Sequence, residues 1–265
     1  MVIAAGVRAS ISVSLPRMRI GKPGRPVTRI AQAYPDRVEV RGRDLSVDVM
    51  GRLGFVEYFH LLLTGNEPTD DQRYFLDLLL VSIAEHGLMP TNVAARMTLA
   101  ADPRSLQGAV AAGILGAGEV VLGTSEACAR LLERSEPALQ IAREYRDAGR
   151  KIPGFGHPVH TPVDPRAERV LQLAEEHGVS GSSVARAREL CEAVAETWDK
   201  PLPMNVSMAI AAVLLDLGFD ASVAKAIPIL ARTAGLLAHL AEEQREPIGF
   251  LLAGAAEEAV TYEPE

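Results

Sequence analysis

The stretch Lys151-Ile-Pro-Gly-Phe-Gly-His-Pro-Val-His-Thr-Pro-Val-Asp-Pro-Arg-Ala-Glu-Arg-Val170 is the most informative part of the chain. Its prolines and glycines keep the first half out of helices and strands, so His157 is expected on a stiff, exposed loop. Asp164 as the N-cap and Pro165 at the first helical position then start a helix. Arg166 falls in the first turn, where the helix dipole disfavours a cation unless it holds an anion. The stretch therefore predicts a site for an anion with a transferable proton.

Helical spacing of apolar residues dominates the chain from Val47 onward. Residues that commonly start or end helices separate the periodic segments. The predicted helices cover residues 48–63, 68–83, 92–101, 107–118, 126–132, 137–148, 165–177, 182–198, 204–217 and 221–244. Residues 37–45 alternate as a short hairpin or extended segment would, and no second strong strand pattern follows. The sequence therefore predicts an all-α protein.

Glycines between helical segments predict two helical domains. Gly123 and Gly218 each separate helices and can absorb backbone rotation. We expect a basic N-terminal arm at residues 1–37, a large helical domain formed by residues 38–122 and 213–265, and a small helical domain at residues 123–212.

The first 35 residues carry basic side chains and no acidic ones. The basic residues are Arg8, Arg17, Arg19, Lys22, Arg25 and Arg29. Such a composition can mark a transit peptide, but the prolines and glycines among these residues interrupt a continuous amphipathic helix. A basic arm on a cytoplasmic protein is therefore the favoured interpretation.

The chain has 265 residues, a net charge of -7 and a pI near 5.5. This charge gives no general reason to bind nucleic acid or an anionic membrane. Cys128 and Cys191 form no metal-binding spacing, which fits a reducing compartment and no structural zinc. The most apolar stretch, residues 226–240, is interrupted by a proline, Arg232 and His239, so we expect no membrane-spanning helix.

Two residues stand out as polar side chains in apolar surroundings. Arg232 must reach solvent or meet an anion, because an unpaired buried charge is very costly. A structural salt bridge to one of the chain's own carboxylates is an equally weighted alternative. His86 follows a helix that is expected to be buried, and a core or cap histidine is the alternative to a ligand-binding one. With His157 and Arg166, these residues predict a cluster suited to a small polycarboxylate.

Other templates fit less well. His160 follows His157 by three residues, but zinc is disfavoured because a proline intervenes and no further Cys/His cluster exists. Gly154-Phe-Gly156 lacks the third glycine and the preceding strand of a dinucleotide-binding loop. The chain contains no Walker loop, nucleophile elbow or RNA-binding signature. The anion site remains the sequence-based prediction.

A series of short motifs runs between residues 38 and 244. They are Val40-Arg-Gly-Arg-Asp-Leu45, Phe55-Val-Glu-Tyr-Phe-His-Leu-Leu-Leu-Thr-Gly-Asn-Glu-Pro68, Glu85-His-Gly87, Gly154-Phe-Gly-His157 with Asp164-Pro-Arg166, Pro203-Met-Asn-Val206, and Ala231-Arg-Thr-Ala-Gly-Leu-Leu-Ala-His239. Jointly they resemble the citrate synthase superfamily, and within it the short citryl-CoA lyase branch. The resemblance implies an all-α fold of a large and a small domain, a homodimer, no tightly bound cofactor, a coenzyme A thioester as substrate, and an oxaloacetate- or citrate-like partner.

The same resemblance implies roles for residues at matching positions. His86, Arg166 and Arg232 are similar to the family's oxaloacetate or citrate binders, and His157 to the residue that also moves the proton of the carbonyl or hydroxyl oxygen. The wall that holds coenzyme A is implied to comprise Lys151, Gly154, Phe155, Gly156 and Asn205.

Two positions depart from the family pattern. Val121 stands where the family has a histidine that stabilises the acetyl-CoA enolate, and Ser207 stands where it has an aspartate that exchanges the methyl proton. Loss of one enolate donor costs about 10²- to 10³-fold in rate by analogy with oxyanion holes, and serine is too weak a base to act unassisted. The replacement donor would be a backbone N–H, Thr124, Ser207 or a water positioned by Glu119. Ser207 and Glu119 are therefore candidate catalytic residues beside His157.

Three functions are compatible with this pattern. The favoured one is a carbon–carbon lyase or condensing enzyme that acts on citryl-CoA or a related 3-hydroxyacyl-CoA. The second is a divergent acyl-CoA enzyme in which Val121 and Ser207 remodel the acyl pocket for another substrate. The third is an inactive homologue or subunit that binds coenzyme A and carboxylates. Because fold does not fix function, these alternatives differ only in what the site does.

Overall fold

The computed structural model describes residues 26–157 and 159–264. Their contacts divide the chain into two compact units, Met1–Leu53 and Gly54–Glu265, and each is described by itself. Most basic residues of the predicted N-terminal arm, Arg8, Arg17, Arg19, Lys22 and Arg25, lie outside the described residues. The predicted division into a large and a small helical domain stays a prediction.

The first unit contains a small antiparallel sheet. Its strands β1 (Ala31–Ala33), β2 (Val38–Val40) and β3 (Arg43–Asp44) lie in the order β1-β2-β3. Arg41 and Gly42 connect β2 to β3 with φ angles of 51° and 78°, as tight hairpin turns require. The predicted hairpin is therefore confirmed, whereas β1 was missed because it falls in the stretch expected to be an arm. A π-helix, η1 (Leu45–Val49), follows the sheet.

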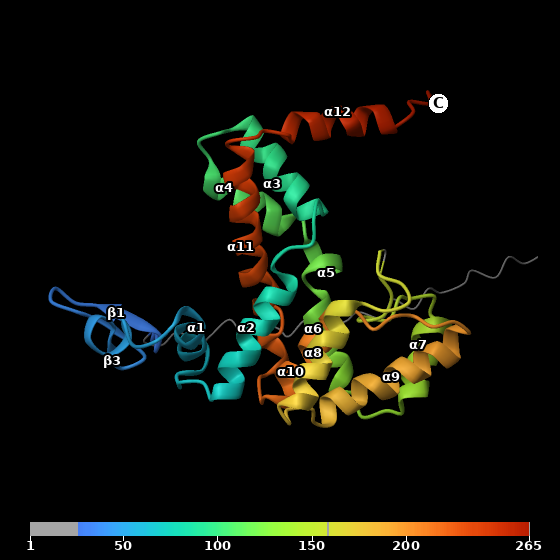
Figure 1. The fold of residues 1–265 in the computed structure, drawn as a ribbon, viewed down its shortest axis with the longest axis horizontal. Helices are drawn as coiled ribbons and strands as arrows, with labels where there is room; N and C mark the ends of the chain where they lie inside the picture. Colours follow the sequence, from blue (N-terminus) through green and yellow to red (C-terminus); the bar gives the residue numbers. More distant parts are fainter. Residues whose placement is uncertain (1–25, 158, 265) are drawn as a thin grey trace, which may run out of the picture. The chain divides into compact units, whose positions relative to one another are not determined.

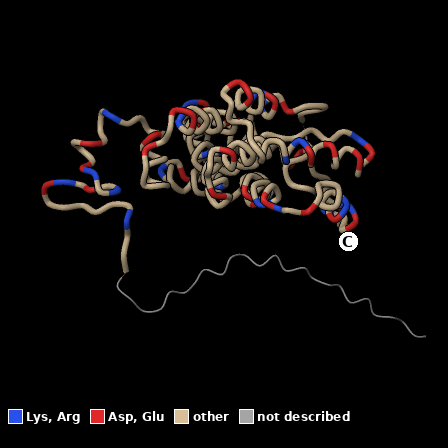
Figure 2. Tube along the Cα trace, turned by 90° about the horizontal axis from the view of Figure 1, so that it is seen from below, with Lys and Arg blue, Asp and Glu red and all other residues tan. Residues whose placement is uncertain are grey.

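The second unit is helical, which confirms the all-α prediction. Its helices are α1 (Phe55–Thr64), α2 (Asp70–Ala84), α3 (Pro90–Ala101), α4 (Leu106–Leu115), α5 (Gly118–Val121), α6 (Thr124–Leu132), α7 (Ala138–Asp147), α8 (Pro165–Glu176), α9 (Ser182–Trp198), α10 (Val206–Asp216), α11 (Ala226–Glu243) and α12 (Gly249–Ala259), with a 3-10 turn η2 (Ala221–Val223) before α11. Basic and acidic positions are interspersed along these helices (Figure 2).

Local chemistry explains where these helices begin and end. Thr69 accepts a hydrogen bond from the N–H of Gln72 at the start of α2, and the Gln72 side chain accepts one from the N–H of Thr69, so the two form a capping box. The predicted helix at 48–63 was wrong in its first half. Gly51, with φ 75°, ends the π-helical segment, and α1 starts only after its N-cap residue Gly54. The helix α12 was not predicted.

Two hydrophobic cores share one helix. The larger core is built mainly from α2, α6 to α10 and the start of α11, and the smaller one joins α3, α4 and the later part of α11 (Figure 1). On α11, Ile227 belongs to the larger core, whereas Leu236 and Leu240 belong to the smaller core, and all three are fully buried. Each such burial contributes about 1.5–3 kcal/mol. The helix α11 thus holds the two cores together.

The segment Ala221–Glu243 is long and apolar enough to cross a membrane by length and composition alone. The interruptions by Arg232 and His239 do not prevent this, contrary to our expectation. Its residues Ile227, Leu236 and Leu240 are, however, buried in the two cores. This packing is typical of the core helix of a globular domain.

A glycine permits α11 to approach the end of α2. A Cβ at Gly235 would overlap the carbonyl oxygen of Ala84, which is backbone and cannot move aside cheaply. We expect Gly235→Ala to lower the free energy of unfolding by about 2 kcal/mol, as overpacking does. Urea unfolding followed by circular dichroism measures this change. The matched control is Gly254→Ala in α12, where nothing lies within 4 Å and alanine should stabilise the helix slightly; equal stability of the two variants would contradict the close-approach argument.

Candidate active site

Backbone hydrogen bonds hold the loop before His157 against the start of α10. The N–H of Gly156 donates to the carbonyl of Pro203 at 2.8 Å, and the N–H of Asn205 donates to that of Gly154 at 2.9 Å. The Asn205 side chain adds a bond from Nδ2 to the carbonyl of Gly156 at 3.1 Å. These hydrogen bonds therefore hold the loop that carries His157 in a fixed conformation.

Gly154 allows this loop to pack closely against the larger core. Its φ of 85° favours glycine, and a Cβ there would collide with Met208 and Cys128 in the core. The residue is buried and faces the larger core. Of the residues predicted to form the coenzyme A wall, Gly154 and Asn205 therefore fix the conformation of the loop.

Asp164 joins the loop, α8 and α10. Its carboxylate is fully buried, caps α8 by accepting from the Arg166 N–H, and accepts from the Val206 N–H at 3.0 Å. The Arg166 side chain donates to both carboxylate oxygens, from Nε at 3.0 Å and from Nη2 at 2.9 Å. Burial alone would raise the pKa of Asp164, but the hydrogen bonds and charge of Arg166 outweigh it and hold this pKa below its ordinary value. The predicted cap is confirmed, and Asp164 is the chain's own partner for the first-turn arginine.

The ring of His157 is fixed in one tautomer by the backbone. Its Nδ1 accepts hydrogen bonds from the N–H groups of Val159 at 3.1 Å and His160 at 3.0 Å. A neutral ring that accepts both bonds carries its proton on Nε2, so the 3.3 Å contact with Nη2 of Arg166 brings two donors together and is not a hydrogen bond. Burial lowers the pKa of His157, and the nearby His160 and Arg166 lower it further. In this state His157 is a neutral N–H donor.

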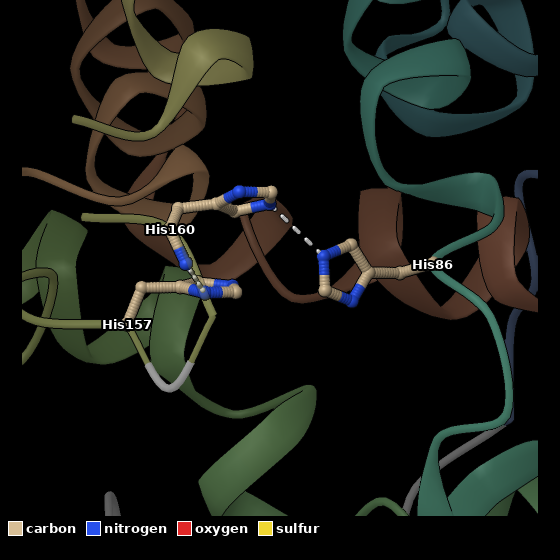
Figure 3. Close-up of side chains that lie close together, drawn as sticks. All are labelled: His86, His157 and His160. Carbon is tan, nitrogen blue, oxygen red and sulfur yellow. Dashed lines mark hydrogen bonds between the residues drawn. The ribbon is translucent and has the colours of Figure 1, made fainter. Parts of the chain in front are cut away.

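Three histidine rings converge at this point (Figure 3). His157 and His160 project from one loop, and His86 approaches from the segment after α2, so that His86 Nε2 lies 3.2 Å from His160 Nε2. One nitrogen from each ring falls within 4.8 Å of the others, as in a metal-binding cluster. The hydrogen bonds argue against that use, because Nδ1 of His157 is occupied and Nε2 faces the Arg166 guanidinium at 3.3 Å. The cluster is therefore better suited to hydrogen bonding and proton transfer.

A carboxylate fixes the segment that carries His86. Glu85 accepts hydrogen bonds from the N–H groups of His86 at 2.8 Å and Gly87 at 2.7 Å, and its other oxygen lies 3.0 Å from Nε2 of His239. Nδ1 of His239 in turn accepts from Nε of the buried Arg96 at 3.0 Å. Burial would raise the pKa of Glu85, but the bonds from His239 and His86 hold it below its ordinary value. The chain from Arg96 to Glu85 thus orients His86.

Arg232 has buried polar atoms without partners. The residue is 3% exposed, and Nε and Nη1 make no hydrogen bond with any described residue. Burial lowers the pKa of Arg232, the charge of Glu85 opposes this, and Arg166 lowers the pKa further. The structural salt bridge considered above does not form among the described residues. A buried guanidinium in this state favours a bound anion.

One cavity of about 460 Å³ lies against α8 and α9, and a larger one of about 620 Å³, within the usual size range of ligand pockets, opens beside His157. The larger one is lined by Lys151, Ile152, Phe155, Gly156, His157, Trp198, Lys200 and Leu202. It combines two ammonium groups with aromatic and aliphatic walls. The predicted residues Lys151, Phe155 and Gly156 therefore line one cavity together with His157.

The remaining predicted catalytic residues lie elsewhere. Glu119 is exposed on α5, and no hydrogen bond among the described residues links it to the histidines or to Arg166. Val121 is half-buried at the end of the same helix. Ser207 is buried in the first turn of α10, where its N–H donates to Oδ1 of the N-cap Asn205 at 3.1 Å. The structure therefore brings together His86, His157 and Arg166, with Arg232 near enough to influence them electrostatically.

Sequence reasoning missed several residues of the site. Glu85 and His239 lie within motifs already quoted, but their pairing depends on α2 meeting α11. Trp198 and Lys200 end α9 and follow it, and only the tertiary structure turns them towards Lys151. The His-x-x-His spacing of His157 and His160 was the one local signal that could have indicated their shared site.

Comparison with known proteins identifies a match over most of the chain. The family "Citrate synthase, C-terminal domain" matches residues 27–249. "Citrate synthase 2" of Bacillus subtilis is 29% identical over 199 residues, which cover 72% of this chain and 52% of that protein. "Putative citrate synthase 2" of Mycobacterium tuberculosis is 33% identical over 190 residues, which cover 68% and 50%. The chain thus spans about half the length of these relatives.

Solved structures match nearly the whole chain. Citryl-CoA lyase from Hydrogenobacter thermophilus superposes with a TM-score of 0.81 and 31% identity, covering 93% of this chain and 96% of that one. ATP citrate lyase from Methanothrix soehngenii, solved with citrate and coenzyme A, superposes with a TM-score of 0.76 at 21% identity, covering 93% and 43%. The second match concerns the fold alone.

Proposed function

Because the chain belongs to the citrate synthase family, we propose that it cleaves or forms a carbon–carbon bond between an acyl-CoA and a 2-oxo acid such as oxaloacetate. Cleavage of citryl-CoA is the favoured reaction. The observation that carries the proposal is the buried guanidinium of Arg232, with its unpaired Nε and Nη1 and its proximity to Arg166. Guanidinium groups hold carboxylates through paired, charge-assisted hydrogen bonds. A di- or tricarboxylate would supply the missing partners.

His157 suits the oxygen that changes charge during this reaction. Its Nε2–H is preset by the backbone bonds to Nδ1 and lies beside Arg166. Such a fixed donor stabilises the alkoxide or carbonyl oxygen of the substrate without reorganising during the reaction. His157 therefore acts as an oxygen-side donor in this proposal.

The cavity beside His157 suits a coenzyme A thioester. Lys151 and Lys200 would neutralise phosphate groups, while Trp198 and the aliphatic walls would cover the apolar parts of the ligand. Coenzyme A is a substrate in this scheme, and no tightly bound cofactor is needed.

Lys200→Ala should weaken coenzyme A binding about tenfold, because it removes one charge-assisted contact worth about 1.5 kcal/mol. Isothermal titration calorimetry with coenzyme A measures the effect, and citrate affinity should not change. Lys225→Ala, before α11 and outside this cavity, is the matched control. Unchanged coenzyme A affinity in Lys200→Ala would place the phosphates elsewhere.

A second function is favoured by Val121 and Ser207, which lack the enolate donor and the base of the family pattern. The chain would then be a binding homologue or subunit without turnover. A coupled assay with citryl-, malyl- and methylcitryl-type thioesters, run beside calorimetry with citrate, oxaloacetate and coenzyme A, separates the two. Turnover supports the lyase, binding without turnover supports the binding protein, and absence of both contradicts both.

We also propose that the chain forms a homodimer. Large apolar side chains remain exposed in the second unit, among them Val81, Leu115, Leu237, Phe250 and Leu251. Exposed apolar surface of this kind is typical of subunit contacts. Sedimentation equilibrium of the full chain should give twice the monomer mass, and a monomer at micromolar concentration would contradict the proposal.

A further inference from the structure

The carboxylate of Glu85 lies between two residues of α11 that can both bind it. A Cβ at Gly235 would lie 3.0 Å from Oε2 of Glu85, so this oxygen rests against the helix there. Residues three and four apart on a helix are neighbours, so Arg232 and His239 flank Gly235 on the same side of α11. Oε2 lies 3.0 Å from Nε2 of His239, whereas Nε and Nη1 of Arg232 make no hydrogen bond with any described residue. His239 therefore holds a carboxylate that the buried guanidinium on the next turn also attracts.

The ring of His239 is fixed as a donor towards Glu85. Nε and Nη2 of Arg96 lie 3.0 and 2.8 Å from Nδ1 of this ring. A guanidinium has no acceptor, so Nδ1 accepts and the ring carries its proton on Nε2. Arg96 is 1% exposed and pairs with the buried Glu243 at 2.9 Å, which keeps its side chain in place. The Nε2–H group of His239 therefore donates to Oε2 of Glu85.

The other contacts of Glu85 do not confine Oε2. The other oxygen, Oε1, accepts from two backbone N–H groups and from Nδ2 of Asn92 at 3.1 Å. Among the described residues, the only donor to Oε2 besides His239 is the same amide, at 3.3 Å. The side chain of Glu85 is 44% exposed, so packing leaves it room to turn. Its charge raises the pKa of Arg232, so the carboxylate lies within electrostatic range of this guanidinium.

We propose that His239 is a positioning residue for substrate binding, because it keeps Glu85 away from Arg232 and so leaves the guanidinium to a substrate carboxylate. The proposal rests on the carboxylate-binding role that the proposed function gives to Arg232. Without the bond from His239, Oε2 would turn to Arg232, where an ion pair would give the buried guanidinium a partner from its own chain. Citrate would then have to displace Glu85 before it could bind.

Citrate binding to the full chain, measured by isothermal titration calorimetry, tests the proposal. His239→Leu removes the donor, and we expect citrate affinity to fall about tenfold, the effect of pairing Arg232 with Glu85 in about nine-tenths of the molecules. His239→Gln restores an N–H donor at this position, so its affinity should stay within about threefold of the wild type. In a Glu85→Gln background, His239→Leu should change the affinity by less than about threefold, because the amide brings no charge to Arg232.

A measurement without ligand separates this proposal from the function on which it rests. Arg232→Met should raise the melting temperature of the otherwise unchanged protein, because it removes a buried charge that lacks hydrogen-bond partners among the described residues. In a His239→Leu background the same substitution should not raise the melting temperature, since it would then break an ion pair with Glu85. Thermal unfolding followed by circular dichroism measures both changes.

The matched control is His177→Leu. His177 also lies beside a carboxylate, that of Asp71 at 3.7 Å, and stacks on Tyr74, which is not part of the candidate site. Its loss should leave citrate affinity unchanged.

Two results would overturn the proposal. Unchanged citrate affinity in His239→Leu would show that Glu85 and citrate do not compete for Arg232. An equal loss of affinity in the Glu85→Gln background would show that His239 acts only through the orientation of His86. If the wild type binds no citrate, the carboxylate-binding function fails, and the melting temperatures then decide whether His239 still keeps Glu85 away from Arg232.

Discussion

Arg232→Met should abolish most carboxylate binding and at the same time stabilise the unliganded protein. The wild-type Arg232 is 3% exposed, and its Nε and Nη1 have no hydrogen-bond partner among the described residues, a costly arrangement that methionine removes while filling similar space. We expect citrate affinity to fall about 100-fold, since losing one partner of a desolvated charged pair costs about 2–5 kcal/mol. The unfolding free energy without ligand should rise by about 1–2 kcal/mol, as when buried charges are replaced by apolar residues.

Calorimetry with citrate and thermal unfolding without ligand measure the two effects on one protein sample. The essential result is that citrate affinity falls while the free energy of unfolding rises. If Arg232 only stabilised the fold, its replacement would lower the free energy of unfolding. Arg104→Met is the matched control, since Arg104 is exposed and should change neither quantity. Loss of stability in Arg232→Met would show that its guanidinium is paired within the free protein and does not serve as an anion site.

Asp164→Asn should be the most destabilising conservative substitution in the site. It replaces a fully buried carboxylate that binds the Arg166 side chain twice and accepts from the Val206 N–H. An amide places its own N–H groups against one of these donors and leaves Arg166 without a counter-charge. We expect a loss of about 3 kcal/mol in the free energy of unfolding at neutral pH, as for broken buried ion pairs.

The same substitution should change the acid sensitivity of the fold. The pKa of Asp164 in the folded chain lies below its ordinary value of 3.8, so its stabilising contribution is fully present above that value and disappears as pH falls through the folded pKa. The stability difference between wild type and Asp164→Asn should therefore shrink in strong acid. Urea unfolding at a series of pH values measures this difference. Asp220→Asn, at the exposed cap of η2, is the control and should cost little, because asparagine caps as well as aspartate. A difference that grows as the pH falls would contradict the assigned ionisation.

The elements with local causes could be predicted from the sequence. The cap formed by Asp164 and Pro165 and the start of α2 at Thr69 depend on residues within one turn of each other, so they were found. The break at Gly51 was missed, because apolar spacing continues across a glycine whose φ is set by the folded backbone. The helix α12 begins where Glu243 accepts from the Gly249 N–H, a cap that reaches back to the preceding helix.

Four residues of the candidate site, His86, His157, Arg166 and Arg232, could be predicted from the sequence. Arg232 stood out because a cation in an apolar stretch needs an explanation wherever the fold places it. The sequence could not show whether Arg232 meets a carboxylate of the chain, and this was decided by the packing of α11 against α2. Glu85 and His160 have ordinary local contexts, and their importance arises from contacts with His239 and His86 across long sequence separations.

The helix α11 links anion binding at Arg232 to the stability of the two hydrophobic cores. Arg232 lies between Ile227 in the larger core and Leu236 in the smaller one, so an anion on its guanidinium stabilises a helix on which both cores depend. Local opening of α3 and α4 requires their contacts with α11 to loosen. Ligand binding should thus slow amide hydrogen exchange in α3 and α4, which build the smaller core. The rate of amide hydrogen exchange in the smaller core would then report whether the ligand is bound.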